Sequence, residues 1–480
     1  MSANRSARAG LQAVTGTGAR MAIQVVNLVV LARLLAPAEF GVYAMAMTVI
    51  GFASLFRDMG LSTAAVQAAE LPTQMRDNLW WINTGVGAGL AAAAVAAAPA
   101  TAQFFHEPDV AVMMYLLAPT LLLSGATAQY AASLMRQVRF GVIALAETTG
   151  ALVGLVLAIV LASNGAGIWA LAVPQLAAGV LVLGVEAAAA GWLPMRPRRG
   201  HGTRALFRFG AAVFGSQILT YVHRNVDAVL MGRLHGVQVT GMFNRATQMT
   251  RMPIAMLSGP FSSVALATMA PHQTDSSALA RLAAKGQVLL ALPVLTLAGG
   301  LIAAADPVVE IALGPGWRDA VPFVRLIAAS EALALMASVG GWIITSQGIP
   351  DRLIRLSTIS TVVKLTFVGV GSLWGPYGIV AGVLAAQVVL WPTSLALAGR
   401  FTGIPTRHLL IRSYLLVGVI GTSAAVGWAV GHWVGAELGP IGHILTTAAA
   451  MVGVVALAAL VIPAFRASVQ TFSRTVRSGV

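Results

Sequence analysis

Four polar side chains fall on one face of the apolar stretch 208–231. They stand at positions i, i+3, i+7 and i+10 and are Gln217, Thr220, Arg224 and Asp227. This spacing brings them onto one side of a helix. A charge at the centre of a bilayer costs about 2.5–3.5 kcal/mol on insertion scales, so such residues usually face a cavity. The stripe therefore predicts a membrane helix that faces water or a polar ligand.

The next apolar stretch, 237–260, carries a second polar stripe. Asn244, Gln248 and Arg251 stand at i, i+4 and i+7, and Arg245 lies beside them. The same helical geometry places the first three on one face. We expect this stretch to face the same wet space as the one before it.

Further polar residues interrupt two other apolar stretches. Lys364 lies near the middle of 353–373, and Gln24 and Asn27 mark one side of 13–33. Together with the two stripes, these residues predict a water-filled cavity bordered by helices from distant parts of the chain.

The predicted cavity holds more cations than acids. Arg224, Arg245, Arg251 and Lys364 stand against one buried acid, Asp227. An excess of positive charge in a low-dielectric groove suits an anion, and the planar guanidinium fork matches phosphate oxygens. The residues therefore favour a phosphorylated ligand.

Each cation also has a structural interpretation. Arg224 and Asp227 are three residues apart on one helix and could neutralise each other. Arg245 is close enough to its helix end to extend its side chain outward to the membrane surface. Arg251 and Lys364 lie deeper, where this is harder, and for them we favour the cavity.

Three acids inside apolar stretches are candidates for coupling transport to protons or sodium. They are Glu147, Glu331 and Asp227. Ionisable residues within membrane segments often mark ion or proton pathways. For Glu331 the alternative is an ion pair, either with a neighbouring helix or with Arg325. We expect no resident cofactor and no metal site.

The composition places the chain in a membrane. Of its 480 residues 58% are hydrophobic and 10% are charged, and the mean hydropathy is +0.82. Soluble domains are about 25% charged. With no cysteine, the chain has no disulfides, thiolate metal sites or cysteine nucleophiles. It also lacks the GxxxxGK[ST] phosphate loop, which excludes ATP binding of that type.

Fourteen apolar stretches are long enough to cross a membrane as helices of about 20 residues. They cover residues 13–33, 40–57, 79–102, 110–133, 142–162, 167–190, 208–231, 237–260, 287–307, 320–345, 353–373, 376–398, 410–432 and 441–463. The sequence thus predicts an all-α integral membrane protein with fourteen transmembrane helices.

Basic residues are distributed unevenly between the loops. Most of the 30 lysines and arginines fall on one set of loops and on both termini, whereas FFHEPD, SNGAG, LWGPYG and HWVGAELGP contain none. The positive-inside rule makes the basic side cytoplasmic. We therefore expect cytoplasmic N- and C-termini, and we attribute the net charge of +14 to topology and membrane lipids and not to nucleic acid.

One phrase occurs twice in the chain. RLLAPAEFGVYAMA at 33–46 returns as RLHGVQVTGMFNRA at 233–246, each with glycine eight residues after its first arginine. Six predicted spans separate the copies, so both cross in the same direction, as in a parallel repeat. The alternative is chance recurrence in a chain rich in glycine, leucine and alanine.

The repeat predicts two pseudo-symmetric six-helix lobes with a cavity between them. The predicted divisions are an N-terminal lobe, a basic cytoplasmic linker, a C-terminal lobe, and a last pair of helices with a basic tail. Their bounds are 1–192, 193–207, 208–400 and 401–480.

Several phrases of the chain resemble a known family. ARLLAPAEFGVYAMA, DMGLSTAAVQ, APATAQFFHEPDV, GAGIWALAVPQL and GPGWRDAVP are similar to segments of the Wzx-type polysaccharide repeat-unit flippases. These belong to the multidrug/oligosaccharidyl-lipid/polysaccharide (MOP) exporter superfamily. Asp227 matches an aspartate common in the family, whereas Phe243 departs from its usual tyrosine.

The resemblance implies fourteen helices around a V-shaped central cavity in the inner membrane of a bacterium. It implies transfer of undecaprenyl-diphosphate-linked oligosaccharide from the cytoplasmic to the outer leaflet, for exopolysaccharide or lipopolysaccharide biosynthesis. A polysaccharide polymerase and export machinery would be the protein partners. The diphosphate fits the predicted excess of cations.

We expect a transporter and not an enzyme: the two lobes would give the head group access to each side in turn, and no bond would be made or broken. The main alternative is a multidrug or small-solute antiporter of the same superfamily, although its cavity should carry acids that bind cations. A membrane polysaccharide polymerase is less favoured, because the predicted outer loops are short.

Overall fold

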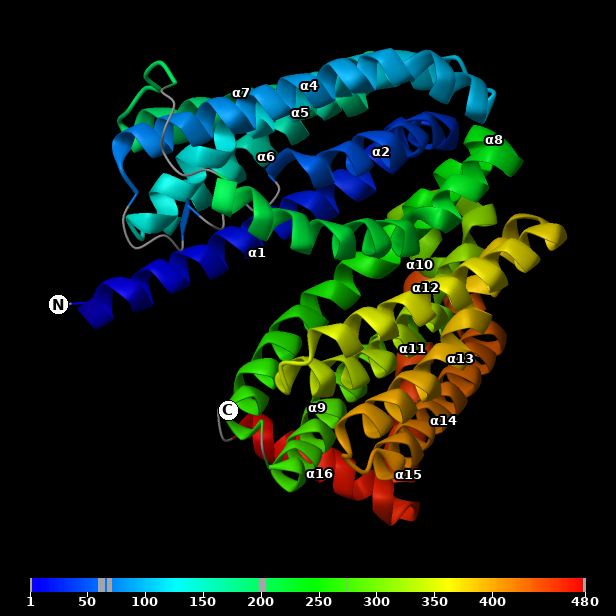
Figure 1. Cartoon of the computed structure of the whole chain (residues 1–480). Coiled ribbons are helices and arrows are strands. Elements are labelled where there is room, and N and C mark those ends of the chain that lie inside the picture. Colours follow the sequence, from blue (N-terminus) through cyan, green and yellow to red (C-terminus); the bar gives the residue numbers. More distant parts are fainter. Residues whose placement is uncertain (1, 59–64, 67–70, 198–203, 274, 478–480) are drawn as a thin grey trace. The chain divides into compact units, whose positions relative to one another are not determined.

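The computed structural model of the chain describes residues 2–58, 65–66, 71–197, 204–273 and 275–477 (Figure 1). These residues form helices joined by short turns, and none of them is in a strand. The all-helical prediction is confirmed for this part of the chain.

The helices are numbered along the chain as in Figure 1. Their bounds are α1 Ser2–Leu34, α2 Pro37–Asp58, α4 Thr73–Phe105, α5 Asp109–Arg136, α6 Phe140–Ser163, α7 Trp169–Ala190, α8 Arg204–Met269, α9 Ser276–Ala303, α10 Ala305–Ala312, α11 Val321–Ser346, α12 Pro350–Gly371, α13 Gly375–Thr402, α14 Arg407–Val430, α15 Gly439–Val461 and α16 Pro463–Arg477.

The chain forms two compact units, Met1–Gly241 and Met242–Val480, here called unit 1 and unit 2. The division falls inside α8, beyond the predicted linker 193–207. The first part of α8 packs with unit 1: the Tyr221 hydroxyl donates a hydrogen bond to the carbonyl oxygen of Thr48 on α2 (2.7 Å). The two compact units do not coincide with the predicted lobes 1–192 and 208–400, and the lobe boundaries stay a prediction.

Eleven helical stretches of the described residues are long and apolar enough to cross a membrane. Three of them are more than 50 residues long: Gln217–His272, Asp351–Thr402 and Arg407–Val461. Fifty helical residues span about 75 Å, against about 30 Å for the hydrocarbon core. Each of the three is therefore longer than one crossing needs, and the protein is a multi-pass membrane protein.

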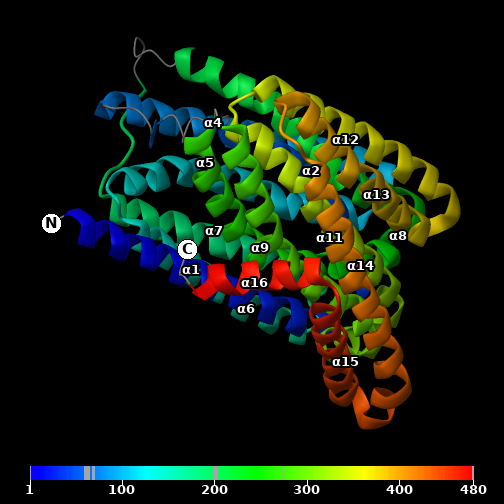
Figure 2. The same ribbon diagram turned by 90° about the horizontal axis from the view of Figure 1, so that it is seen from below.

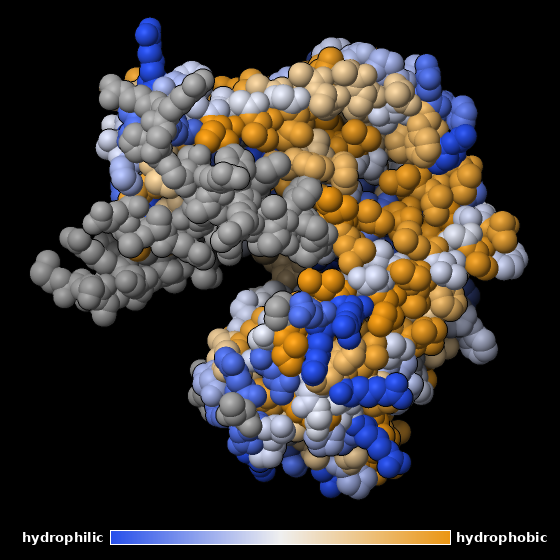
Figure 3. Space-filling model, viewed as in Figure 1, coloured by the Kyte–Doolittle hydropathy of each residue, from blue (hydrophilic) through white to orange (hydrophobic). Residues whose placement is uncertain are grey.

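Large apolar side chains cover much of the surface. Leu145, Val156, Leu445 and Leu457 are 54–64% exposed, which would be costly in water. In Figure 3 broad areas of the coloured surface are hydrophobic, and hydrophilic residues gather in the lower part of the view and at the edges. This surface suits contact with lipid, which replaces water as the solvent around the helices.

The twice-written phrase marks a close crossing of two helices. A Cβ atom added to Gly41 on α2 would lie 1.9 Å from the carbonyl oxygen of Val237, and one added to Gly241 on α8 would lie 1.7 Å from that of Pro37. Val237 lies four residues before Gly241, and Pro37 lies four residues before Gly41. Each glycine therefore contacts the other helix one turn before the other helix's own glycine. The two copies of the phrase meet at this crossing, and their shared glycines allow the two backbones to touch.

A second glycine breaks α8 just before this crossing. Gly236 has φ 76° and ψ −177°, a conformation that residues with a Cβ atom rarely adopt. The break redirects the chain between the two parts of α8.

Unit 2 has an apolar core built from α9, α11, α13 and α14, to which Leu295, Met336 and Leu395 belong. In Figure 2 the C-terminal helix α16 lies across this unit. Its first turn is fixed by Phe465, which is fully buried in the same core.

Candidate functional site

Unit 1 contains a pocket of about 870 Å³ lined by α1, α2, α5, α6 and α7. The charged side chains that line it are Arg20, Arg57, Glu147 and Glu186. Small and apolar residues form most of the remaining wall. The pocket therefore combines two cations and two acids within one bundle of membrane helices.

The close packing of α1 on α6 brings Arg20 to Glu147. A Cβ atom added to Gly16 would lie 2.5 Å from the Cβ atom of Ala144, so the two helices are in contact one turn before the charged residues. Arg20 forms an ion pair with Glu147 through its NH1 atom. Glu147, a predicted coupling acid, thus lines the pocket as part of a neutral pair.

Glu186 is a pocket residue that the sequence analysis did not select. It lies on α7, is 2% exposed, and its buried Oε2 atom has no hydrogen-bond partner in the part of the chain that the structure describes. Gly150 of α6 faces Val182 of α7, since an added Cβ atom would lie 2.9 Å from its Cγ2 atom. The helices α6 and α7 are antiparallel and joined by a short turn. Glu147 lies one helical turn from Gly150 and Glu186 one turn from Val182, both away from the connecting turn, so the two glutamates lie at about the same height along the helix pair.

A signal for Glu186 was present in the sequence. It is the only charged residue of α7 (WALAVPQLAAGVLVLGVEAAAA), and the rule that selected Glu147 applies to it equally.

The α5 wall of the pocket carries hydroxyl groups. Ser124 and Thr127 donate hydrogen bonds to the backbone carbonyls of Thr120 (2.7 Å) and Leu123 (2.8 Å). Their protons are used within the helix, which leaves the oxygen lone pairs as acceptors. On α7, Gln175 donates to the hydroxyl of Tyr43 (2.8 Å).

In unit 2, the predicted cation Arg251 has an acidic partner. Its Nε atom donates to Oε1 of Glu331 on α11 at 2.5 Å. Of the two pairings predicted for Glu331, the one with a neighbouring helix is confirmed, because Arg325 instead pairs with Asp306 (2.5 Å). Glu331 therefore offsets one of the four predicted cations, and the excess of positive charge is smaller than the sequence suggested.

The stripe on the second part of α8 forms a hydrogen-bonded chain. Arg245 donates through NH1 to Oε1 of Gln248 (3.0 Å), whose amide nitrogen donates to Oδ1 of Asn244 (3.0 Å). Arg245 is only 4% exposed, so its guanidinium is held inside unit 2 and does not extend to the surface. The predicted spacing correctly placed Asn244 and Gln248 on one face.

The other predicted residues are divided between the units. Lys364 on α12 of unit 2 is 3% exposed, and Asp227 on α8 of unit 1 is 2% exposed. Gln217, Arg224 and Gln24 are exposed in unit 1, and Asn27 is half-buried there. Their shared role around one cavity stays a prediction.

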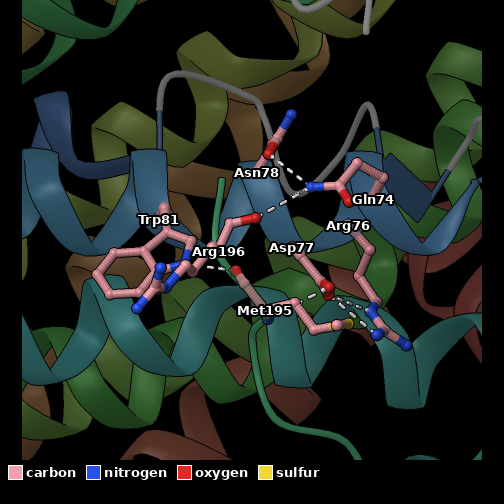
Figure 4. A network of polar contacts seen from close by, with 7 residues as sticks. All are labelled: Gln74, Arg76, Asp77, Asn78, Trp81, Met195 and Arg196. Carbon is pink, nitrogen blue, oxygen red and sulfur yellow. Dashed lines mark hydrogen bonds and ion pairs between the residues drawn. The ribbon is translucent and has the colours of Figure 1, made fainter. Parts of the chain in front are cut away.

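A polar network fastens the start of the predicted linker to α4 (Figure 4). The Trp81 indole donates to the carbonyl of Met195 (2.8 Å), and the Gln74 amide donates to that of Arg196 (3.2 Å). The Met195 N–H donates to Oδ2 of Asp77 (3.3 Å). Three side chains of α4 therefore hold the backbone of the segment that leaves α7; residues 198–203 of the linker lie outside the described residues.

Asp77 is the centre of this network. It is 1% exposed and pairs with NH2 of Arg76 (2.9 Å). The Arg76 guanidinium lies over the ring of Trp192, 3.9 Å from its centroid. Asp77 thus joins the Met195 backbone to Arg76, and Arg76 contacts Trp192, which directly precedes the predicted linker.

Replacement of Asp77 with alanine should loosen the linker. It leaves the Met195 N–H and the Arg76 guanidinium without their acceptor, which typically costs about 1–3 kcal/mol. We expect a lower unfolding temperature of the detergent-purified protein and faster proteolysis between α7 and α8. Asp109→Ala, at an exposed aspartate, is the control; equal effects of both variants would argue against the network.

Comparison with known proteins places this architecture. The chain matches the family described as "Polysaccharide biosynthesis protein" over residues 30–322, more than half its length. It is 23% identical to the teichuronic acid biosynthesis protein TuaB of Bacillus subtilis over 304 residues, which are 62% of each chain. It is 22% identical to the lipopolysaccharide biosynthesis protein WzxC of Escherichia coli over 379 residues, 76% of this chain and 75% of that protein. It is 27% identical to the succinoglycan biosynthesis transport protein ExoT of Rhizobium meliloti over 326 residues, 66% of this chain and 64% of ExoT.

Solved structures show the same fold. The lipid II flippase MurJ in an inward closed conformation superposes with a TM-score of 0.74 at 13% identity, covering 93% of this chain and 98% of MurJ. An inward-facing multidrug resistance transporter of the MATE family gives a TM-score of 0.52 at 15% identity, covering 80% of this chain and 96% of the transporter.

Of these proteins, ExoT is described as a transport protein, MurJ as a flippase and the MATE protein as a transporter, and none of the three is described as a catalytic enzyme. The predicted resemblance to Wzx-type proteins of polysaccharide biosynthesis is confirmed by the family match and by WzxC. With its all-helical membrane fold and a match over more than half its length, the chain belongs to this family of polysaccharide biosynthesis proteins.

Proposed function

We propose that the protein is a flippase for lipid-linked oligosaccharide repeat units. It would move an undecaprenyl-diphosphate-linked head group from the cytoplasmic to the outer leaflet for exopolysaccharide or lipopolysaccharide biosynthesis. The observation that carries this proposal is the pocket of about 870 Å³, with two arginines and two glutamates on a largely apolar wall inside a bundle of membrane helices, in a chain of a polysaccharide biosynthesis family. A pocket of this size suits a polar head group of several rings.

The proposed topology has fourteen spans in two six-helix lobes and a final pair, with both termini in the cytoplasm. Three of the eleven candidate stretches support it, because each is long enough for two crossings and contains a break. The breaks are Gly236 in α8, the turn Ser372–Trp374 and the segment Gly431–Leu438.

The proposed mechanism is alternating access around a polar cavity. The head group enters from the cytoplasm while the polyprenyl tail stays in lipid, and rocking of the lobes releases the head group outside. Arg224, Arg245, Arg251 and Lys364 are proposed to attract the diphosphate, Arg251 in a state in which it is not held by Glu331. The sugars farther from the diphosphate would bind to other parts of the cavity.

Coupling to protons or sodium is proposed through the acids of the bundle. Glu147 and Glu331 each hold an arginine of another helix, Arg20 and Arg251. Binding of a cation to either acid would release its arginine and change how two helices are joined. Asp227, buried on α8, is the third candidate.

A strain that lacks the chain tests the function. Surface polysaccharide should disappear, and lipid-linked oligosaccharide should accumulate on the cytoplasmic face, where it is protected from an added periplasmic glycosidase. A plasmid copy should restore both. Because the fold is shared with a multidrug transporter, drug resistance is measured in the same strains. If the strain without the chain loses drug resistance but keeps its surface polysaccharide, the protein is a multidrug antiporter and not a flippase.

A further inference from the structure

Two charged residues of the unit 1 pocket each have one buried side-chain atom without a hydrogen-bond partner among the described residues. Arg20 and Glu147 satisfy each other. Arg57, from α2, has a buried Nε atom, and Glu186 has a buried Oε2 atom, neither with a hydrogen-bond partner among the described residues. Both residues line the same pocket.

Buried polar atoms without partners are rare in proteins and need an explanation. Here the two unpartnered groups have opposite character: an N–H that can only donate and a carboxylate oxygen that can only accept. No ion pair joins Arg57 to Glu186 in the part of the chain that the structure describes, although both border one space. A ligand that satisfies both must accept and donate.

The chemistry of the pocket separates the candidate ligands. A phosphate would suit Arg57 but would meet the like charge of Glu186. A metal cation or an ammonium group would suit Glu186 but would meet the charge of Arg57. A sugar hydroxyl donates one hydrogen bond and accepts others, so neighbouring hydroxyls of one ring can serve both groups.

The walls of the pocket agree with a sugar. Ala128, Ala131, Gly150, Ala151, Ala178 and Gly179 line it, and their small side chains leave room for rings. Ser124 and Thr127 offer acceptor oxygens along α5. Among the described residues that line the pocket none is aromatic, so these residues would hold a sugar by hydrogen bonds and not by ring stacking.

We propose that the pocket of unit 1 is a saccharide subsite. Arg57 donates hydrogen bonds to, and Glu186 accepts them from, hydroxyls of the sugar head group, while the Arg20–Glu147 pair shapes the pocket between α1 and α6. This inference rests on the proposed function, and it assigns sugar recognition to residues apart from the cations proposed for the diphosphate.

Substitution of Glu186 tests the acceptor role. Glutamine keeps an acceptor oxygen but loses the charge, whereas alanine removes the acceptor, and hydrogen bonds to charged groups are the stronger ones. The probe is lipid-linked oligosaccharide extracted from the host membrane and reconstituted with the purified protein in vesicles. We expect the initial rate of translocation to fall about tenfold or more for Glu186→Ala and only a few-fold for Glu186→Gln. Glu437→Ala, at an exposed glutamate, should translocate at the original rate.

Equal loss in both Glu186 variants, together with loss of the response to a pH gradient, would overturn the proposal and make Glu186 a proton carrier. Unchanged rates in both would also overturn it. Thermal unfolding of each variant shows whether a loss of rate reflects a loss of folded protein.

Cysteine labelling provides a second measurement. The chain has no cysteine, so a single introduced thiol reports on its own position. Ala178→Cys in the pocket should react with N-ethylmaleimide in membrane vesicles from cells blocked before the first sugar transfer, and several-fold more slowly in vesicles from cells that make the oligosaccharide. Glu437→Cys should react equally in both.

The outcomes separate the two proposals. If cells without the chain still export polysaccharide, the flippase proposal fails. If they do not, but labelling of Ala178→Cys is independent of cargo, the flippase proposal stands and the saccharide subsite is overturned.

Discussion

Replacement of Gly241 with valine should prevent the protein from accumulating in a folded form. The first added carbon would lie 1.7 Å from the carbonyl oxygen of Pro37 and 3.0 Å from the backbone nitrogen of Gly41. These are backbone atoms within a helix, so they cannot turn aside as the end of a side chain could. Insertion of carbon into a packed core usually costs about 1–3 kcal/mol, and a rigid backbone obstacle places this case above that range. The helices α2 and α8 would have to separate at their crossing.

The measurement is the amount of monodisperse protein recovered in detergent and its unfolding temperature. Gly89→Val is the matched control, because a Cβ atom at Gly89 in α4 meets nothing within 4 Å. We expect the control to accumulate normally and the Gly241 variant to aggregate or be degraded. Similar yields of both would show that the two backbones are not in contact at this point.

The reciprocal residue supplies an internal check. Gly41→Ala should be destabilising for the same reason, since its Cβ atom would lie 1.9 Å from the carbonyl oxygen of Val237. Substitutions that share a contact are not additive. Once one glycine has been replaced and the helices have moved apart, the second replacement should cost less than it does alone.

This crossing also shows what a sequence can reveal about a fold. The repeated phrase was visible as spacing, and the structure brings its two copies together at Gly41 and Gly241; that they are corresponding parts of two lobes stays a prediction. Their direct contact was not predictable, because periodicity describes which face a residue occupies and not which segment it meets. The contact between Asn244 and Gln248 was predictable, because the two residues are four apart on one helix and helical periodicity alone places them on the same face.

Partners distant in the sequence were beyond such reasoning. Arg20 and Glu147 are 127 residues apart, and the residues that hold Met195 lie more than 100 residues before it. Both contacts depend on which helices pack together. For Glu186 the charge within an apolar stretch was visible in the sequence, but the pocket that it shares with α1, α2, α5 and α6 was not, because a pattern on α7 does not tell which helices pack around it.

The Arg251–Glu331 pair gives the second large prediction. Arg251→Glu would place two carboxylates where the ion pair now stands at 2.5 Å. Because the side chains are 38% and 23% exposed, the cost lies between that of a surface pair and a buried one, about 1–3 kcal/mol. We expect reduced stability and loss of surface polysaccharide.

The exchanged double variant Arg251→Glu/Glu331→Arg separates the structural role of the pair from a role in binding cargo. It restores opposite charges between α8 and α11, so the unfolding temperature should recover most of its loss. Polysaccharide export should stay low if the cation is needed on α8 to meet an anionic head group. Full recovery of export would instead mean that Arg251 acts only by joining two helices, and the proposed anion site would then rest on Arg224, Arg245 and Lys364. The same exchange at Arg325 and Asp306, whose side chains are 34% and 56% exposed, is the control and should change neither stability nor export.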